Sequence, residues 1–245
     1  MREVALFLPC FVDQFRPSAA SATVRVLEKL GLRVRLLDSI ACCGQPLWNA
    51  GHAPLATRLV RQSAASLRQV ERVICPSGSC TAFMRGHYAE LLDGEVATPK
   101  VFEFCEFLHD ELGITELFGT FNARVAVHVG CHAQRELGLG PMSERRSNGV
   151  DKVRGLLSSL SGIELVSAAR ADECCGFGGT FAAVEQAVSC KMGSDRVRGY
   201  VEAGATVLVS TDPSCLMHMN SVAQTGGLRL LYIAELLEEA MRESS

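Results

Sequence analysis

The sequence lacks the features that mark several common classes of protein. No uninterrupted apolar segment approaches the ~18 residues that a membrane-spanning helix needs. No long basic run is present and the net charge is −3, which argues against nucleic acid as the main partner. The first ten residues have an acid near their start and only a short apolar run, so we expect no signal peptide and a cytoplasmic location.

Familiar catalytic motifs are also lacking. No Ser-His-Asp arrangement or paired-carboxylate motif stands out. The glycine-rich stretch at residues 176–180 follows two cysteines rather than a strand, and it has neither Walker A nor G-x-G-x-x-G spacing. We therefore expect no nucleotide there, and we interpret the glycines as allowing the backbone to approach a bound group closely.

The size and composition are those of an ordinary globular protein. The 245 residues can form one large domain or two small ones, and either can bury a core. The apolar fraction is 48% and the charged fraction is 21%, so a disordered chain is excluded.

Cysteine is abundant, with eleven residues. Disulfides are rare in the cytoplasm, so metal binding or redox chemistry is the better explanation of such a count. Eight of the cysteines form two sets in the same order: a lone cysteine after an apolar run, a Cys-Cys-Gly, and a cysteine past a second apolar run. The first set is Cys10, Cys42, Cys43 and Cys80, and the second is Cys131, Cys174, Cys175 and Cys215.

The spacings of the two sets are C-x31-CC-x36-C and C-x42-CC-x39-C. Two such sets in one order, covering nearly the whole chain, indicate a duplication. Soft sulfur ligands select soft metal centres, so four thiolates that converge would hold an iron–sulfur cluster or zinc. Adjacent cysteines rarely form a disulfide with each other, and they can reach two metals of one cluster, which favours a multinuclear centre.

Apolar runs in the first half alternate with segments of helical spacing. The expected strands are residues 4–8, 33–37 and 72–75, and the expected helices are residues 18–30, 53–67 and 81–91. Gly31 is a natural stop for the first of these helices. We expect a loop at residues 38–44 to hold the first double cysteine.

The second half repeats this order. The expected strands are residues 124–129, 163–166, 206–209 and 228–231, and the expected helices are residues 149–160, 181–201, 212–224 and a C-terminal helix ending near residue 242. Residues 92–121 have no evident twin; we expect a helix at 102–112 and a crossover after it. We therefore predict two repeats, residues 1–112 and 113–245.

Strands that alternate with helices predict an α/β fold with mostly parallel sheets covered by helices. We expect two such repeats, packed about a pseudo-twofold axis. The lone cysteines then follow strands and the doublets lie in strand-to-helix loops, at the carboxyl ends of the strands, where ligands of parallel sheets collect. Helices that begin just after these loops would point N–H groups at an anionic centre.

The remaining cysteines are better explained without a ligand role. Cys75 lies five residues before Cys80, but its counterpart in the second half is Ser210, so we interpret it as a buried strand residue. Cys105 and Cys190 lie in helix-like segments without counterparts, and we expect small core residues there.

Other side chains near the sets have two interpretations each. His218 follows Cys215 with C-x2-H spacing, and His128 and His132 flank Cys131. Each can ligate a metal, bond a sulfur or carry protons, but a structural histidine is the simpler interpretation. Asp212 is either an oxygen ligand or, as we favour, the N-cap of the following helix.

The phrases CCGQP, PSGSC, CCGFGGTF and SCL resemble the CCG, or cysteine-rich, domain family, and in particular the lactate utilization protein A family within it. The CCG family includes the cysteine-rich subunit of heterodisulfide reductase and the iron–sulfur subunits of glycolate oxidase. The resemblance covers the whole chain. It implies a subunit that acts with an iron–sulfur partner and a third subunit in oxidising L-lactate to pyruvate, with electrons passing towards quinone.

One departure from the family concerns the end of each repeat. Heterodisulfide reductase-like members end each repeat in C-x-x-C, and the resulting five cysteines can hold a non-cubane cluster. Here Ser77 and Asp212 stand where the first cysteine of each pair would be. Four cysteines per set suit a cubane [4Fe–4S] cluster, up to two in the chain, with zinc at one site as an alternative.

The sequence therefore predicts an iron–sulfur electron-transfer subunit. Three alternatives remain open: a glycolate-oxidase-type subunit, a heterodisulfide-reductase-type redox subunit, and a non-catalytic zinc-binding scaffold.

Overall fold

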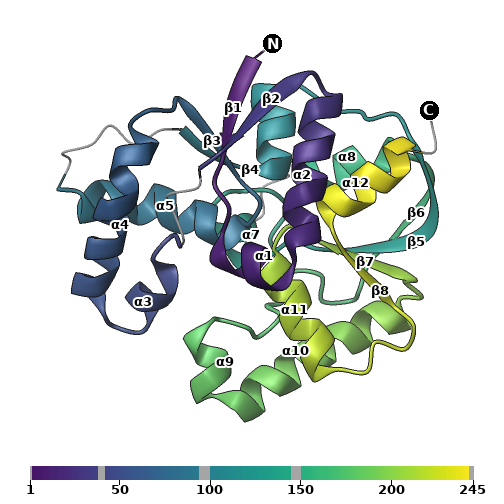
Figure 1. Cartoon of the computed structure of the whole chain (residues 1–245). Coiled ribbons are helices and arrows are strands. Elements are labelled where there is room, and N and C mark those ends of the chain that lie inside the picture. The colour runs from purple at the N-terminus through teal and green to yellow at the C-terminus, as the bar shows by residue number, and fades with distance from the viewer. Residues whose placement is uncertain (1, 38–41, 94–99, 145–149, 243–245) are drawn as a thin grey trace.

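The computed structural model describes residues 2–37, 42–93, 100–144 and 150–242. These residues form two four-stranded parallel sheets flanked by helices (Figure 1). The strand order is β2-β1-β3-β4 in the first sheet and β6-β5-β7-β8 in the second. The predicted fold class, α/β with two repeats and parallel sheets, is confirmed.

The two repeats contain the same elements in the same order. The first consists of β1 (Arg2–Leu6), α1 (Cys10–Phe15), α2 (Pro17–Lys29), β2 (Leu32–Leu36), α3 (Gln45–Asn49), α4 (Ala53–Leu67), β3 (Arg72–Cys75), α5 (Gly78–Leu91), β4 (Lys100–Glu103), α6 (Phe104–Glu106) and a π-helical turn, η1 (Phe107–Glu111). The second consists of β5 (Thr120–His128), α7 (Cys131–Arg135), α8 (Lys152–Ser158), β6 (Ser161–Val166), α9 (Thr180–Val184), α10 (Gln186–Glu202), β7 (Val207–Ser210), α11 (Pro213–Val222), β8 (Arg229–Tyr232) and α12 (Ile233–Arg242).

The expectation that residues 92–121 have no twin is wrong. Strand β4 pairs with β3 as β8 pairs with β7, and the run of α6 and η1 occupies the place of α12. The expected helix at 102–112 is wrong at its start, because Phe102 and Glu103 belong to β4. Glu103 ends the strand as a helix N-cap: its carboxylate accepts hydrogen bonds from the backbone N–H groups of Cys105 and Glu106.

The expected long helix at 181–201 is two helices, α9 and α10. They meet at Glu185, whose φ of −109° and ψ of 49° lie outside the helical region. Helix α3 begins just after Gly44, as expected. Short helices α1 and α7 were not predicted, since five or six residues carry too little periodicity. The other expected elements are present with ends shifted by a few residues, and Gly31, at φ +83°, follows the end of α2 as expected. Residues 38–41 of the expected loop and residue 149 of the expected helix lie outside the described residues.

One hydrophobic cluster spans both repeats, and a second lies within the first repeat. Helix α2 lies beside α12 of the other repeat (Figure 1), and α6 packs against α8 in the same manner. Buried residues of both repeats, such as Val4, Leu6, Val125 and Leu236, belong to one contiguous cluster. None of the helices in the described part of the chain is long and apolar enough to cross a membrane.

Ion pairs reinforce the α2–α12 contact. Arg16 donates from Nη2 to Oε2 of Glu235 at 2.7 Å, and Arg25 donates from Nη2 to Oε2 of Glu238 at 2.8 Å. Glu235 also accepts from the Ser18 hydroxyl at 2.5 Å and from the Tyr232 N–H at 2.7 Å. This carboxylate therefore joins the start of the chain to its end.

Candidate metal centres

The first cysteine set comes together at the carboxyl ends of β1, β2 and β3. Cys10 is the first residue of α1, and its sulfur lies 3.7 Å from that of Cys42. Cys80 is the third residue of α5, and its sulfur lies 3.3 Å from that of Cys43. Cys42 and Cys43 are adjacent in the sequence, which joins the two pairs of sulfurs. Four sulfurs from three loops thus form one contiguous group.

The second set repeats this arrangement. Cys131 is the first residue of α7, and the thiol of Cys174 is the main cause of its raised pKa. Cys215 is the third residue of α11, and the thiols of Cys174 and Cys215 are the main causes of the raised pKa of Cys175. A ring nitrogen of His128 and the sulfurs of Cys175 and Cys215 all lie within 4.8 Å of one another. All eight predicted residues are therefore gathered, four to each repeat, and their role as ligands stays a prediction.

Each Cys-Cys-Gly needs its glycine. Gly44 and Gly176 adopt φ of +97° and +87°, in the left-handed region that glycine tolerates best. A Cβ on Gly176 would also lie 2.8 Å from the carbonyl oxygen of Ser189. In this conformation the Gly44 N–H points at the sulfur of Cys42 at 3.4 Å, and the Gly176 N–H points at that of Cys174 at 3.3 Å. The motif thus supplies one backbone donor to one thiolate in each set.

The sets favour negative charge at particular sulfurs. A hydrogen bond from Cys10, then one from Cys43, lowers the pKa of Cys42 to about 3. Hydrogen bonds from Cys131 and Cys175 lower the pKa of Cys174 to about 2. The pKa of Cys10 and that of Cys131 are raised in return, because each thiol donates to its neighbour and is partly desolvated. Each set therefore holds a thiolate readily, which is the form that binds metals.

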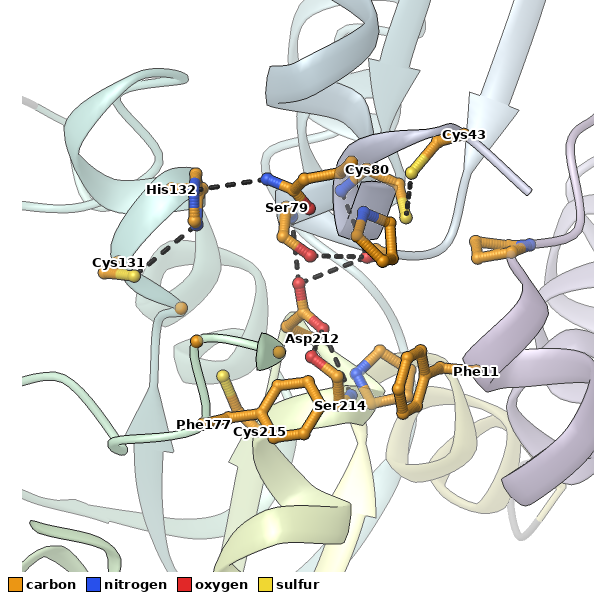
Figure 2. A pocket seen from close by; sticks show the side chains of 18 of the residues that line it. Phe11, Cys43, Ser79, Cys80, Cys131, His132, Phe177, Asp212, Ser214 and Cys215 are labelled. Carbon is orange, nitrogen blue, oxygen red and sulfur yellow. Dashed lines mark hydrogen bonds between the residues drawn. The ribbon is translucent and has the colours of Figure 1, made fainter. Parts of the chain in front are cut away.

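Both sets open onto one cavity of about 110 Å³. Figure 2 shows Cys43 and Cys80 on one side of this space, Cys131 on another and Cys215 below, with Asp212 between them. The two predicted centres are thus neighbours around a shared space, although their cysteines come from opposite halves of the chain. Gly178 and Gly179 line the cavity, which agrees with our interpretation of that glycine-rich stretch.

Asp212 ties the two cysteine-bearing helices together. It is 2% exposed, and its Oδ1 accepts from the N–H and hydroxyl of Ser214, which confirms the predicted N-cap of α11. Its Oδ2 accepts from the Ser77 hydroxyl at 3.1 Å and from the Ser79 N–H at 2.9 Å, at the start of α5. One carboxylate therefore fixes the helices that carry Cys80 and Cys215.

Two further contacts cross between the repeats at the cavity, and they differ in character. The ring of Phe11, after Cys10, meets that of Phe177, after the second Cys-Cys-Gly, at 5.3 Å between centroids. At the equivalent place, His132 lies 3.3 Å from the amide nitrogen of Gln45. One contact is apolar and the other polar.

The remaining sequence candidates are found in the following places. Cys75 is fully buried at the end of β3, as predicted, and bonds the carbonyl of Ser77. Cys105 is a core residue, but the expectation for Cys190 is wrong, because Cys190 lies on an exposed part of α10. His218 is buried beside the hydroxyl and carbonyl of Ser189, so it is a structural histidine.

Sequence reasoning missed the partners of His128. Its Nδ1 lies 2.9 Å from the hydroxyl of Tyr200, which accepts a hydrogen bond from Arg196. Burial, and then the charge of Arg196, lower the pKa of His128 to about 4. Arg196 and Tyr200 are four apart on a helix and so share a face, but nothing in the sequence connects that face with His128.

The donor set fits a sulfur-ligated metal group. Each repeat gathers four cysteine sulfurs, points a backbone N–H at one of them and opens to the shared cavity. Such a set can hold an iron–sulfur cluster or a zinc ion.

Comparison with known proteins agrees with the duplication and the fold. The cysteine-rich domain model, CCG, matches residues 4–85 and again residues 125–220. Lactate utilization protein A from Exiguobacterium sp. is 32% identical over 255 residues, covering 100% of both chains. Its namesake from Bacillus velezensis is 31% identical, covering 96% of this chain and 98% of its own.

A crystal structure of a hypothetical protein from Helicobacter pylori has the same fold. It superposes with a TM-score of 0.67 at 13% identity, and the match covers 100% of this chain and 50% of that one. Two family matches, one per repeat, and full-length relatives at about 30% identity lead to one conclusion. The chain belongs to the CCG cysteine-rich domain family and, within it, to the lactate utilization protein A family.

Proposed function

We propose that the protein is an iron–sulfur electron-transfer subunit of a complex that oxidises L-lactate to pyruvate. The observation that carries the proposal is the pair of four-sulfur groups on one shared cavity. The names of the full-length relatives supply the link to lactate. An iron–sulfur cluster at such a site supplies one-electron transfer between a substrate and a partner protein.

The proposed ligands are the eight cysteines that the sequence predicted. They are Cys10, Cys42, Cys43 and Cys80 for the first centre, and Cys131, Cys174, Cys175 and Cys215 for the second. Four sulfurs in each group match the number that a cubane [4Fe–4S] cluster takes. At positions 77 and 212, Ser77 and Asp212 bond each other, so neither is free to serve as a fifth ligand.

The chain's own residues hold and shape these sites. The N–H groups of Gly44 and Gly176 stabilise a thiolate in each set, and Asp212 fixes the two helices that present Cys80 and Cys215. Phe11 and Phe177 keep one side of the cavity apolar, which restricts access of water to the sulfurs.

We further propose partners and a location that follow from the family. The partners are an iron–sulfur subunit and a third subunit, which pass electrons towards quinone, and the complex works in the cytoplasm. We keep the boundary between the repeats at residues 112 and 113, in the segment between η1 and β5.

The test is anaerobic purification followed by iron, sulfide and zinc analysis and EPR spectroscopy. We expect iron and acid-labile sulfide for two clusters and an EPR signal on reduction. Absence of iron from both repeats after anaerobic reconstitution would refute the cluster proposal. Deletion of the gene, followed by growth on L-lactate and on glycolate, tests the substrate, and loss of growth on glycolate alone would contradict the lactate assignment.

A second candidate function rests on the second set. His128, Cys175 and Cys215 offer one nitrogen and two sulfurs within 4.8 Å of one another, a mixed donor set that zinc also accepts. A scaffold with structural zinc would show stoichiometric zinc and no visible absorption in the same analysis.

A further inference from the structure

The second repeat carries a buried polar group where the first has a phenyl ring. His128 stands three residues before Cys131, and Phe7 stands three residues before Cys10. Both side chains are at most 1% exposed, and both lie at the carboxyl end of the central strand of their sheet. Nε2 of His128 has no hydrogen-bond partner among the described residues. A ring nitrogen of His128 lies within 4.8 Å of the sulfurs of Cys175 and Cys215.

The hydrogen-bond chain behind His128 decides which ring nitrogen carries the proton. Arg196 is 3% exposed and can only donate, so the oxygen of Tyr200 accepts from it. Tyr200 is 1% exposed, and its own proton has one acceptor in the described structure, Nδ1 of His128 at 2.9 Å. Because Nδ1 accepts, the proton of the imidazole sits on Nε2, the ring nitrogen that is left without a partner among the described residues.

We propose that His128 donates a hydrogen bond from Nε2 to the sulfur atoms of the second centre and thereby gives that centre the higher reduction potential of the two. The inference rests on the proposed function, since it requires a cluster in each repeat. A hydrogen bond to sulfur stabilises the more negative, reduced state, so it raises the potential. Phe7 can offer no such bond to the first centre, and Arg196 adds a buried positive charge behind His128 alone.

The main test is His128→Phe, which copies the residue of the first repeat. The potentials of both centres are measured by an EPR-monitored redox titration of the purified full-length protein. In the wild type we expect the second centre to be reduced first. In H128F we expect the higher of the two potentials to fall and the lower one to stay the same. The difference between the two potentials should therefore narrow.

Two further variants separate hydrogen bonding from packing. His128→Gln keeps an N–H donor in a side chain without a ring, and we expect it to recover part of the lost potential. Tyr200→Phe removes the group that holds the His128 proton on Nε2, and we expect a smaller fall. His218→Gln is the matched control: His218 is also buried in the second repeat, three residues after Cys215, and bonds Ser189 instead of sulfur. It should leave both potentials unchanged.

The inference is overturned if H128F holds both centres with unchanged potentials. It is also overturned if H128F and H128Q both lose iron from the second repeat, because His128 is then a ligand. If H128F alone loses that iron, the Y200F titration decides, and an unchanged potential there refutes the donor role. The proposed function fails separately, and earlier, if the wild type itself holds no cluster.

Discussion

Near the cysteines, the first repeat carries phenylalanines at two positions where the second repeat carries histidines. Phe7 and Phe83 of the first repeat occupy the places of His128 and His218 in the second. Phe83 packs against Trp48 and Tyr88, whereas His218 bonds Ser189 and His128 bonds Tyr200. The duplication kept the positions of the sulfurs and changed what faces them. Two sites with the same proposed ligands can therefore have different properties.

The largest expected effect comes from removing one cysteine from each set. Cys43→Ser and Cys175→Ser should each abolish the centre of their own repeat, so that bound iron falls to roughly half in either variant. Iron and sulfide analysis of anaerobically purified protein measures this. Cys190→Ser changes an exposed cysteine on α10 and should bind iron like the wild type. Loss of all iron from C43S alone would show that the centres do not form independently.

The second prediction concerns Glu103, the last residue of β4. The equivalent residue of the other repeat, at the end of β8, is Tyr232. Burial raises the pKa of Glu103 to about 8, above the 4.5 of an ordinary glutamate. The folded state then binds more protons than the unfolded state between these two values, so stability falls as the pH rises through this window and levels off above it. Glu103→Gln should abolish this dependence.

Below the folded pKa, the free energy of unfolding falls by about 1.4 kcal/mol per pH unit. The wild type should therefore lose on the order of 3 kcal/mol of stability between pH 6 and pH 9, and the Gln variant should not. Anaerobic urea unfolding at both pH values measures the difference. Glu90→Gln changes an exposed glutamate on α5 and serves as the control. Equal pH dependence in E103Q and the wild type would show that Glu103 is ionised in the fold.

The third prediction concerns Glu106 and Glu235, which occupy equivalent positions at the starts of α6 and α12. Each accepts from the backbone N–H three residues earlier, but Glu106 pairs with Arg85 of its own repeat and Glu235 pairs with Arg16 of the other. Glu235→Gln should lower the free energy of unfolding by about 2 kcal/mol, because it leaves the partly buried Arg16 without its carboxylate partner and with only the Leu230 carbonyl.

Denaturant unfolding measures that cost. Glu239 lies on the same helix as Glu235 and forms an exposed pair with Arg229 of β8. Glu239→Gln is the control and should change stability by less than about 0.5 kcal/mol. If both variants unfold at the same denaturant concentration, the contact between the repeats does not depend on Glu235.

The smallest expected losses of stability come from changing the two serines that donate to Asp212, Ser77 and Ser214. Ser77→Ala removes one cap of α5 and one donor to Asp212, and it should cost about 1 kcal/mol. Ser214→Ala removes the side-chain donor to the other oxygen of Asp212 and leaves the backbone cap, so it should cost less. A larger loss in S214A than in S77A, measured by unfolding, would contradict this picture of the central carboxylate.

Much of the arrangement could be predicted from the chain because it depends on local patterns. The alternation of strands and helices predicted parallel sheets, and two cysteine sets in one order predicted two equivalent sites. The prediction of secondary structure was weakest at residues 92–121. Strand β4 is short there, and its last residue, Glu103, resembles a polar helix residue although it is buried as an N-cap. Short helices such as α1 and α7 were missed because a helix of five or six residues shows hardly more than one turn of its period.

The sequence alone determined the identity, order and number of the sulfur ligands that we propose and the type of fold, because strand and helix periods and residue spacings are properties of the chain itself. Only the tertiary structure decided that the two sets face one cavity, that Asp212 joins the helices of both and that Tyr200 stands behind His128. The contact of Asp212 with Ser79 joins residues 133 positions apart, and that of His128 with Tyr200 joins residues 72 positions apart. Their pairing follows from how the two sheets and their helices pack, and spacing along the chain carries no record of it.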